Sequence, residues 1–86
     1  MKVRIAVTTE DIAKGRPRQP CECPIALAIK RRFGSSRYVT VGNRHATRHD
    51  NRRISNARLP IRAQHFIRTF DRGGKVVPST FVLVFD

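Results

Sequence analysis

The sequence predicts an α+β fold in a small single domain that spans residues 1–86. The two ends of the chain alternate apolar and polar residues with the period of a β-strand, and two segments between them carry apolar residues at helical spacing. A chain of 86 residues is too short to give two domains a hydrophobic core each. The hydrophobic fraction of 40% is typical of a folded chain rather than a disordered one.

The first segment, residues 2–8, predicts a half-buried strand because Val3, Ile5 and Val7 alternate with mostly polar residues. The Thr-Thr-Glu-Asp sequence that follows supplies an N-cap and two first-turn acids, and Gly15 ends what can only be a short helix. Residues 16–20 (Arg-Pro-Arg-Gln-Pro) predict an extended loop, since each proline disfavours helix in the residue before it.

The clearest helix is predicted over Pro24–Phe33. Pro24 has the position of a first-turn proline, the next five residues are apolar, and Gly34 can adopt the left-handed conformation that ends helices. Residues 37–41 (Arg-Tyr-Val-Thr-Val) favour a strand, which the Gly-Asn turn at 42–43 terminates. Residues 43–58 carry five arginines and few apolar residues, which indicates a mobile basic loop followed by a short edge strand around Arg53–Ala57.

The last third of the chain predicts a second helix over Ile61–Asp71 and a final strand over Pro78–Asp86. One helix face is apolar and consists of Ala63, Phe66, Ile67 and Phe70, whereas Arg62, His65, Thr69 and Arg72 face away. In the final strand Phe81, Leu83 and Phe85 point inward. Val82 and Val84 make its other face apolar too, which predicts a central or covered strand.

This order permits a ferredoxin-like β-α-β-β-α-β arrangement, with two helices packed on one face of a four-stranded sheet. If the third strand is only a loop, a three-stranded sheet with two helices remains. Nine residues are expected to be buried in one cluster: Val3, Ile5, Val7, Ile25, Ile29, Phe66, Phe70, Leu83 and Phe85.

Several of these segments together resemble a group of small bacteriophage-encoded proteins to which no general activity is attached. The resemblance depends on the strand end Thr-Thr-Glu-Asp-Ile, Gly15, the helix start Cys23–Ala28 (Cys-Pro-Ile-Ala-Leu-Ala), Val41-Gly42, Ala57–Pro60, Phe66–Asp71 and Val77-Pro78 with Phe81. It implies a phage accessory protein that acts in the bacterial host cytoplasm. The chain looks more basic than is usual in the group, above all over residues 43–58.

Charge is the strongest indicator of a partner. The chain has 18 Lys and Arg against 6 Asp and Glu, a formal net charge of +12. Such an excess repels itself in a compact fold, and it favours binding to a polyanion. The predicted binding surface combines the end of the first helix with the basic segment: Lys30, Arg31, Arg32, Arg37, Tyr38, Arg44, Arg48, Arg52, Arg53 and Arg58.

Two function hypotheses follow from this surface. The first is non-catalytic binding of nucleic acid, or of a host nucleoprotein complex, through phosphate contacts with little sequence readout; only Tyr38, with Phe33 second, is available to stack a base. The alternative is an inhibitor that binds the acidic surface of a host protein, such as a defence or transcription enzyme. The oligomeric state is not predicted.

One set of side chains matches a zinc site in number. Cys21, Cys23, His45 and His49 are four potential ligands, but the Cys-x-Cys spacing is tighter than usual and neighbouring arginines would repel a dication. We therefore expect no metal and no cofactor.

Catalysis is not expected either. Cys23 at a helix N-terminus should have a lowered pKa, and a histidine could act as its base. Helix capping nevertheless explains the position of the cysteine fully. The sequence also contains no recognisable carboxylate pair and no phosphate-binding loop. No apolar run reaches 18 residues and no signal-peptide-like stretch follows Met1, which favours a reducing cytoplasm and no membrane insertion.

Overall fold

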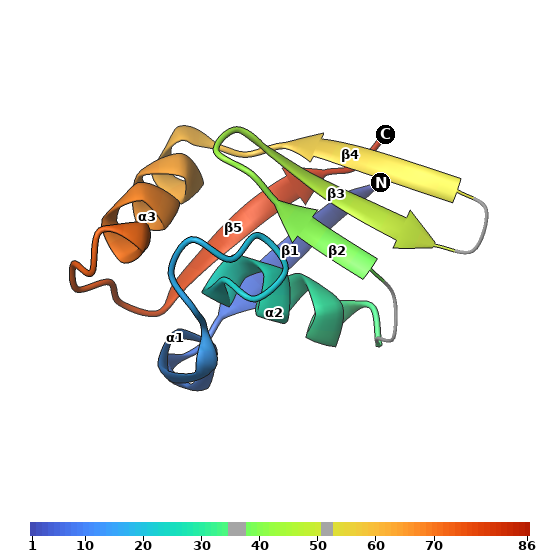
Figure 1. Cartoon of the computed structure of the whole chain (residues 1–86). Helices are drawn as coiled ribbons and strands as arrows, with labels where there is room; N and C mark the ends of the chain where they lie inside the picture. The colour runs from blue at the N-terminus through green and yellow to red at the C-terminus, as the bar shows by residue number, and fades with distance from the viewer. Residues whose placement is uncertain (35–37, 51–52) are drawn as a thin grey trace.

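The computed structural model describes residues 1–34, 38–50 and 53–86, and confirms the α+β class (Figure 1). Its elements in chain order are β1 (Lys2–Val7), α1 (Thr9–Lys14), α2 (Pro24–Arg32), β2 (Tyr38–Val41), β3 (His45–Asp50), β4 (Arg53–Arg58), α3 (Ile61–Asp71) and β5 (Ser79–Val84). The predicted helices and the first and last strands are confirmed to within a few residues. Arg37 and Arg52 lie outside the described residues.

The strands form two antiparallel sheets rather than one. β1 pairs with β5, while β2, β3 and β4 form a meander of their own. An isolated bridge between Ala57 and Phe85 joins the sheets at one corner, and α2 contacts both β1 and β2. Within the described ranges β1 pairs only with β5, and the three middle strands pair with each other. The described strands therefore do not form the single sheet of a ferredoxin-like arrangement.

The prediction of a mobile basic loop ahead of the edge strand is wrong. Residues 45–50 form strand β3, which is the central strand of the meander. Its sequence, His-Ala-Thr-Arg-His-Asp, contains one apolar residue, Ala46, so it has no alternation that sequence inspection could detect. Backbone pairing on both sides holds it, and Ala46 is buried between Val41 and Ala57 in register. The strand exists because its neighbours pair with it, not because its own residues favour strand.

Local signals account for the helices. Thr8 and Asp11 form a capping box at the start of α1, each side chain accepting from the other residue's backbone N–H. Gly15 follows α1 at a close approach, where a Cβ atom would lie 2.7 Å from Cδ of Pro24 and 2.9 Å from the carbonyl oxygen of Asp11. Pro24 begins α2, and Gly34, with φ of 74°, follows its end.

One hydrophobic cluster fills the space between the two sheets and the helices. All nine residues predicted for the core are buried, and eight belong to this cluster. The exception is Phe70, which is 9% exposed and lies outside it. The helix register of α3 is thereby confirmed, since its apolar stripe is buried and Arg62, His65, Thr69 and Arg72 are exposed.

The outer face of β5 is not covered, contrary to the prediction. Val82 and Val84 are 40% and 60% exposed, and their partners in register are Arg4 and Lys2 of β1. β-branched side chains favour strands even at exposed positions, so two valines on the second face did not imply a second covering layer.

Candidate nucleic-acid interface

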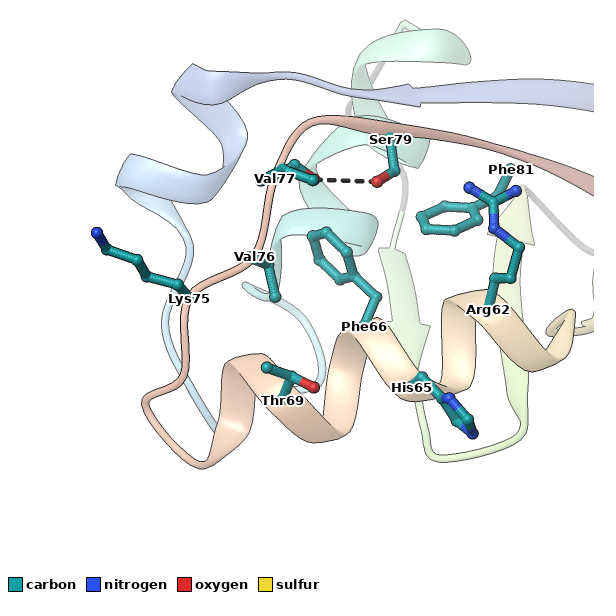
Figure 2. A pocket seen from close by; sticks show the side chains of 9 residues that line it. All are labelled: Arg62, His65, Phe66, Thr69, Lys75, Val76, Val77, Ser79 and Phe81. Carbon is teal, nitrogen blue, oxygen red and sulfur yellow. Dashed lines mark hydrogen bonds between the residues drawn. The ribbon is translucent and has the colours of Figure 1, made fainter.

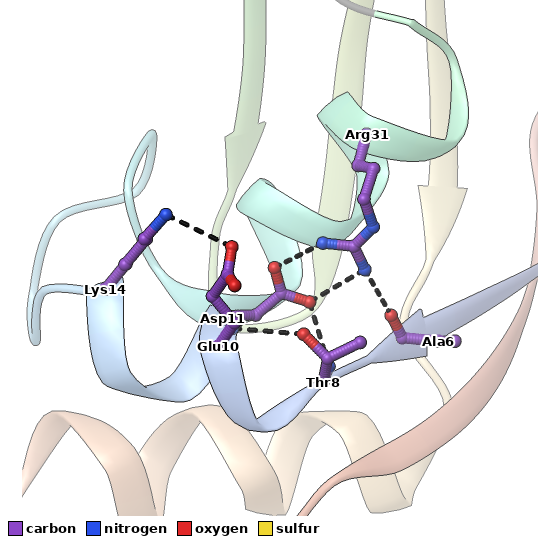
Figure 3. A network of polar contacts seen from close by, with 6 residues as sticks. All are labelled: Ala6, Thr8, Glu10, Asp11, Lys14 and Arg31. Atoms are coloured by element: carbon purple, nitrogen blue, oxygen red, sulfur yellow. Dashed lines mark hydrogen bonds and ion pairs between the residues drawn. The ribbon is translucent and has the colours of Figure 1, made fainter.

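Arg31, predicted to bind a partner, makes contacts that stabilise the fold. Its guanidinium donates to both carboxylate oxygens of Asp11, at 2.5 and 2.9 Å, and to the carbonyl oxygen of Ala6 at 2.8 Å. Figure 3 shows the arginine reaching from α2 to α1 and to the end of β1. Burial alone would raise the pKa of Asp11, but the hydrogen bonds from Arg31 and Thr8 and the arginine charge outweigh it and hold that pKa below its usual value. The same hydrogen bond raises the pKa of Arg31.

The neighbouring cations of α2 are also engaged within the protein. Nζ of Lys30 donates to the carbonyl oxygen of Cys21 at 2.7 Å. The guanidinium of Arg32 lies 5.7 Å from the centroid of the Phe33 ring. These two partners are neutral, so among the described residues at this helix end only Arg31 is paired with a carboxylate.

Arg48 points toward the core side of the meander. In register it lies opposite Val39 on one side and Ser55 on the other, both buried, so it shares their face. Its guanidinium lies 4.1 Å from the centroid of Phe33 and 5.6 Å from that of Phe85. Arg48 is thus largely explained by packing, and the expectation that it belongs to a mobile, exposed loop is wrong.

The remaining predicted residues lie on separate faces. Arg53, at the start of β4, lines a hollow of about 310 Å³ with Arg48 on the core side of the meander. Arg58, at the other end of β4, pairs in register with His45 on the outer face. Tyr38 also lies on the outer face, at the opposite end from Arg58, in one row with His49 and Ile54. Arg44 is exposed in the turn between β2 and β3.

The four candidate zinc ligands are not brought together. His45 and His49 are at the two ends of β3, and four residues of strand separate them by about 13 Å, far more than one metal ion could span. The Sγ atom of Cys23 is buried and accepts a hydrogen bond from the backbone N–H of Ala26. Within the described ranges, no three His, Cys, Asp or Glu residues form a group able to hold a metal ion.

The thiol of Cys23 also differs from the expectation. Burial raises its pKa, and the hydrogen bonds from the backbone at Ala26 and Ile25 compensate only in part. The helix N-terminus was expected to lower this pKa, but desolvation of the thiolate in the core is the larger effect. The group is therefore a capping residue with a protonated thiol, unlike an activated nucleophile.

A further basic surface follows α3, a helix that the sequence-based binding surface did not include. Three shallow hollows lie along the basic side of this helix, with volumes of about 330, 250 and 270 Å³. Their lining contains five cations and a histidine, which we call the α3 basic face: Arg44, Arg62, His65, Arg68, Arg72 and Lys75. No Asp or Glu of the described residues lines any of the three. A further hollow of about 290 Å³ borders the helix where Ile67 and Asp71 face Arg18.

The first of these hollows lies between α3 and the segment leading into β5 (Figure 2). The rings of Phe66 and Phe81 lie inside it, edge to face at 5.7 Å, while His65 extends away toward solvent. Arg62 lies at the edge of the hollow, with its guanidinium 5.6 Å from the centroid of the Phe81 ring. The hollow thus has an apolar floor and a cationic rim.

Most carboxylates lie away from the α3 basic face. Glu10 pairs with Lys14 at 3.1 Å and Glu22 approaches Arg16 at 4.0 Å, both in the N-terminal part of the chain. Asp71, at the end of α3, accepts from the backbone N–H of Arg18 at 2.8 Å. Ion pairs therefore offset part of the positive charge around α1 and the loop after it. Along α3, the single carboxylate of Asp71 stands against Arg62, Arg68 and the following Arg72.

A signal for this surface was present in the sequence. The apolar stripe of α3 requires that Arg62, His65 and Arg72 face solvent, as predicted, and Arg68 is exposed with them. What the sequence did not reveal is that Arg44 shares a hollow with Arg68, although 24 residues separate them, because that proximity depends on how the turn after β2 docks against the helix.

No protein-family profile, curated protein sequence or solved structure matches the chain. Among the described residues, no helix is both long enough and apolar enough to cross a membrane.

Proposed function

We propose that this is a non-catalytic nucleic-acid-binding protein that contacts the phosphate backbone through the α3 basic face. The observation that carries the proposal is the gathering of Arg44, Arg62, Arg68, Arg72 and Lys75 around three hollows whose described lining includes no carboxylate. Guanidinium groups suit this role because they bind phosphate with two parallel hydrogen bonds. Following the resemblance noted above, we propose that it acts as a phage accessory protein in the bacterial cytoplasm.

The dimensions of the surface support a backbone contact. Arg62, His65, Arg68 and Arg72 follow one another at intervals of three or four residues, which places them on one side of the helix. From the first to the last, the helix rises about 15 Å. One strand of a duplex carries about four phosphates over that length, so each of these four side chains has a phosphate within reach.

The test compares two variants that lose the same charge. The first is Arg62→Gln/Arg68→Gln/Arg72→Gln on the α3 basic face. The matched control is Lys2→Gln/Arg4→Gln/Arg16→Gln, at exposed positions on β1 and the loop after α1. Each removes three charges from the net +12. Binding to a labelled 20-base-pair duplex is followed by fluorescence anisotropy at several salt concentrations.

For the α3 variant, we expect the slope of log affinity against log salt to fall in magnitude by about 2.7, because each lost contact accounts for about 0.9. The control should change the slope by less than one unit. Equal losses in both variants would show that binding depends on net charge alone, and no binding by the parent would remove the proposal.

The alternative function is inhibition of a host protein through an acidic surface. The apolar floor between Phe66 and Phe81, rimmed by Arg62, favours it, because arginine beside an apolar pocket is typical of interface anchors. The affinity of this kind of binding should fall less steeply with salt than phosphate binding does, because an apolar centre contributes to it. Recovery of a nuclease-resistant protein complex from bacterial lysate, lost in the α3 variant, would support this function over the first.

A further inference from the structure

The outer face of the β2–β3–β4 meander carries exposed apolar groups that the fold does not use. Register pairing places Tyr38, His49 and Ile54 in one row across the three strands. Tyr38 is 56% exposed and Ile54 is 58% exposed. All five phenylalanines are buried or half-buried, so Tyr38 is the one exposed Phe or Tyr side chain of the chain.

The Tyr38 ring makes one aromatic contact and stays 56% exposed. The His49 ring meets it edge to face, with centroids 5.1 Å apart and an interplanar angle of 69°. This contact orients the tyrosine ring without covering it, as its exposed fraction shows. An oriented, uncovered aromatic ring on a sheet face is the feature on which unpaired bases stack.

The aromatic row is continuous with the α3 basic face. The next row along the sheet is polar, formed by Thr40, Thr47 and Asn56, and the row after it holds His45 opposite Arg58. Arg44 directly precedes His45 and shares a hollow with Arg68 of α3. From the aromatic row to His45 the distance along β3 is about 13 Å, the reach of a few nucleotides.

We infer that the outer face of the meander binds single-stranded nucleic acid, with bases stacked on Tyr38 and His49 and the backbone continuing past Arg58 and Arg44 to α3. This inference rests on the proposed function and narrows its substrate class. A duplex keeps its bases stacked on each other, so it can use the α3 basic face but not the aromatic row.

Charge complementarity favours single-stranded nucleic acid over a second copy of the chain as the partner of this face. A homodimer formed through the outer face would bring two molecules of net charge +12 together, with Arg58 of each near the contact. A polyanion neutralises the same charges instead.

The sequence offers a direct probe, since Tyr38 is the only tyrosine and the chain has no tryptophan. Its intrinsic fluorescence therefore reports on this ring alone. Three oligomers are titrated: a 15-nucleotide deoxythymidine strand, an abasic backbone of the same length, and a 15-base-pair duplex. We expect quenching by the deoxythymidine strand only, and about tenfold tighter binding of that strand than of the abasic backbone.

The variants separate stacking from other roles of the residue. Tyr38→Ala should weaken binding of the deoxythymidine strand about tenfold and leave the abasic backbone unaffected. Tyr38→Phe should bind nearly as the parent does, since the ring is kept. Val84→Ala is the matched control, because Val84 has a similar exposure of 60% on the outer face of the other sheet.

Equal affinity for the deoxythymidine strand and the abasic backbone, with no quenching, would overturn the inference while leaving phosphate binding intact. Loss of all binding in the parent would overturn both. Self-association would be indicated by two results: tyrosine fluorescence that changes with protein concentration alone, and a dimer that Tyr38→Ala abolishes. Together they would assign the outer face to a second copy of the chain and overturn the inference.

Discussion

Replacing Asp11 by Asn should destabilise the protein without affecting its binding of nucleic acid. The substitution keeps the shape of the side chain and an oxygen that can accept from the backbone N–H of Thr8, but it removes the negative charge that Arg31 contacts through two hydrogen bonds. Arg31 also donates to the carbonyl oxygen of Ala6 in β1 (Figure 3), so the charge of Asp11 helps to hold the arginine that links β1, α1 and α2.

The magnitude follows from the exposure of the two partners. The Asp11 side chain is 6% exposed but that of Arg31 is 51% exposed, so solvent screens part of the interaction. A hydrogen bond to a charged group contributes about 1.5–3 kcal/mol when buried, and screening reduces this to about 1–2 kcal/mol. For a domain of this size the melting temperature should fall by about 5–15 °C.

The stability difference between the parent and Asp11→Asn should depend on pH in a defined direction. Because the pKa of Asp11 is lowered in the folded state, its charge stabilises the fold above the unfolded pKa of about 3.9. That contribution is lost as pH falls through the lower, folded pKa. Urea denaturation followed by circular dichroism should therefore show a gap between parent and Asp11→Asn at pH 7 that narrows progressively below about pH 4.

Arg31→Ala extends the test to function. It leaves the buried carboxylate of Asp11 without its main partner, so the free energy of unfolding should fall further, by about 2–3 kcal/mol. The salt slope for duplex binding should stay within one unit of the parent slope. A stability gap that stays constant from pH 7 to pH 3, or a large loss of slope in Arg31→Ala, would refute the assignment of this pair to the fold.

Three further variants or measurements test the packing. Gly15→Ala should cost about 1–3 kcal/mol, measured by urea denaturation, because the added Cβ meets Pro24 at 2.7 Å. Ellman's reagent should modify Cys21 rapidly and Cys23 only on unfolding, since Cys23 is 3% exposed with a raised pKa; two fast thiols would contradict this. Arg48→Ala should lower the free energy of unfolding by about 1–2 kcal/mol through lost contact with two aromatic rings, and an unchanged stability would show that the arginine is not held by them.

The sequence by itself determined the elements whose signals are local. Alternating valine and isoleucine predicted β1, the capping box and Gly15 bounded α1, and the proline at the start of α2 marked its first turn. The apolar stripe of α3 predicted both its bounds and its exposed basic side. These signals are local because a cap or a helical face is defined by residues within one or two turns of each other.

The tertiary structure alone decided which cations are available to a partner. β3 has one apolar residue and becomes a strand only through pairing with β2 and β4, and that pairing fixes which side of the sheet Arg48 occupies. Because side chains alternate with a period of two, the register turns Arg48 toward the Phe33 ring and Arg58 toward the outer face. Arg44 and Arg68 likewise meet only when the turn after β2 docks beside α3. Contacts between residues distant in sequence depend on chain topology, which no local pattern of residues encodes.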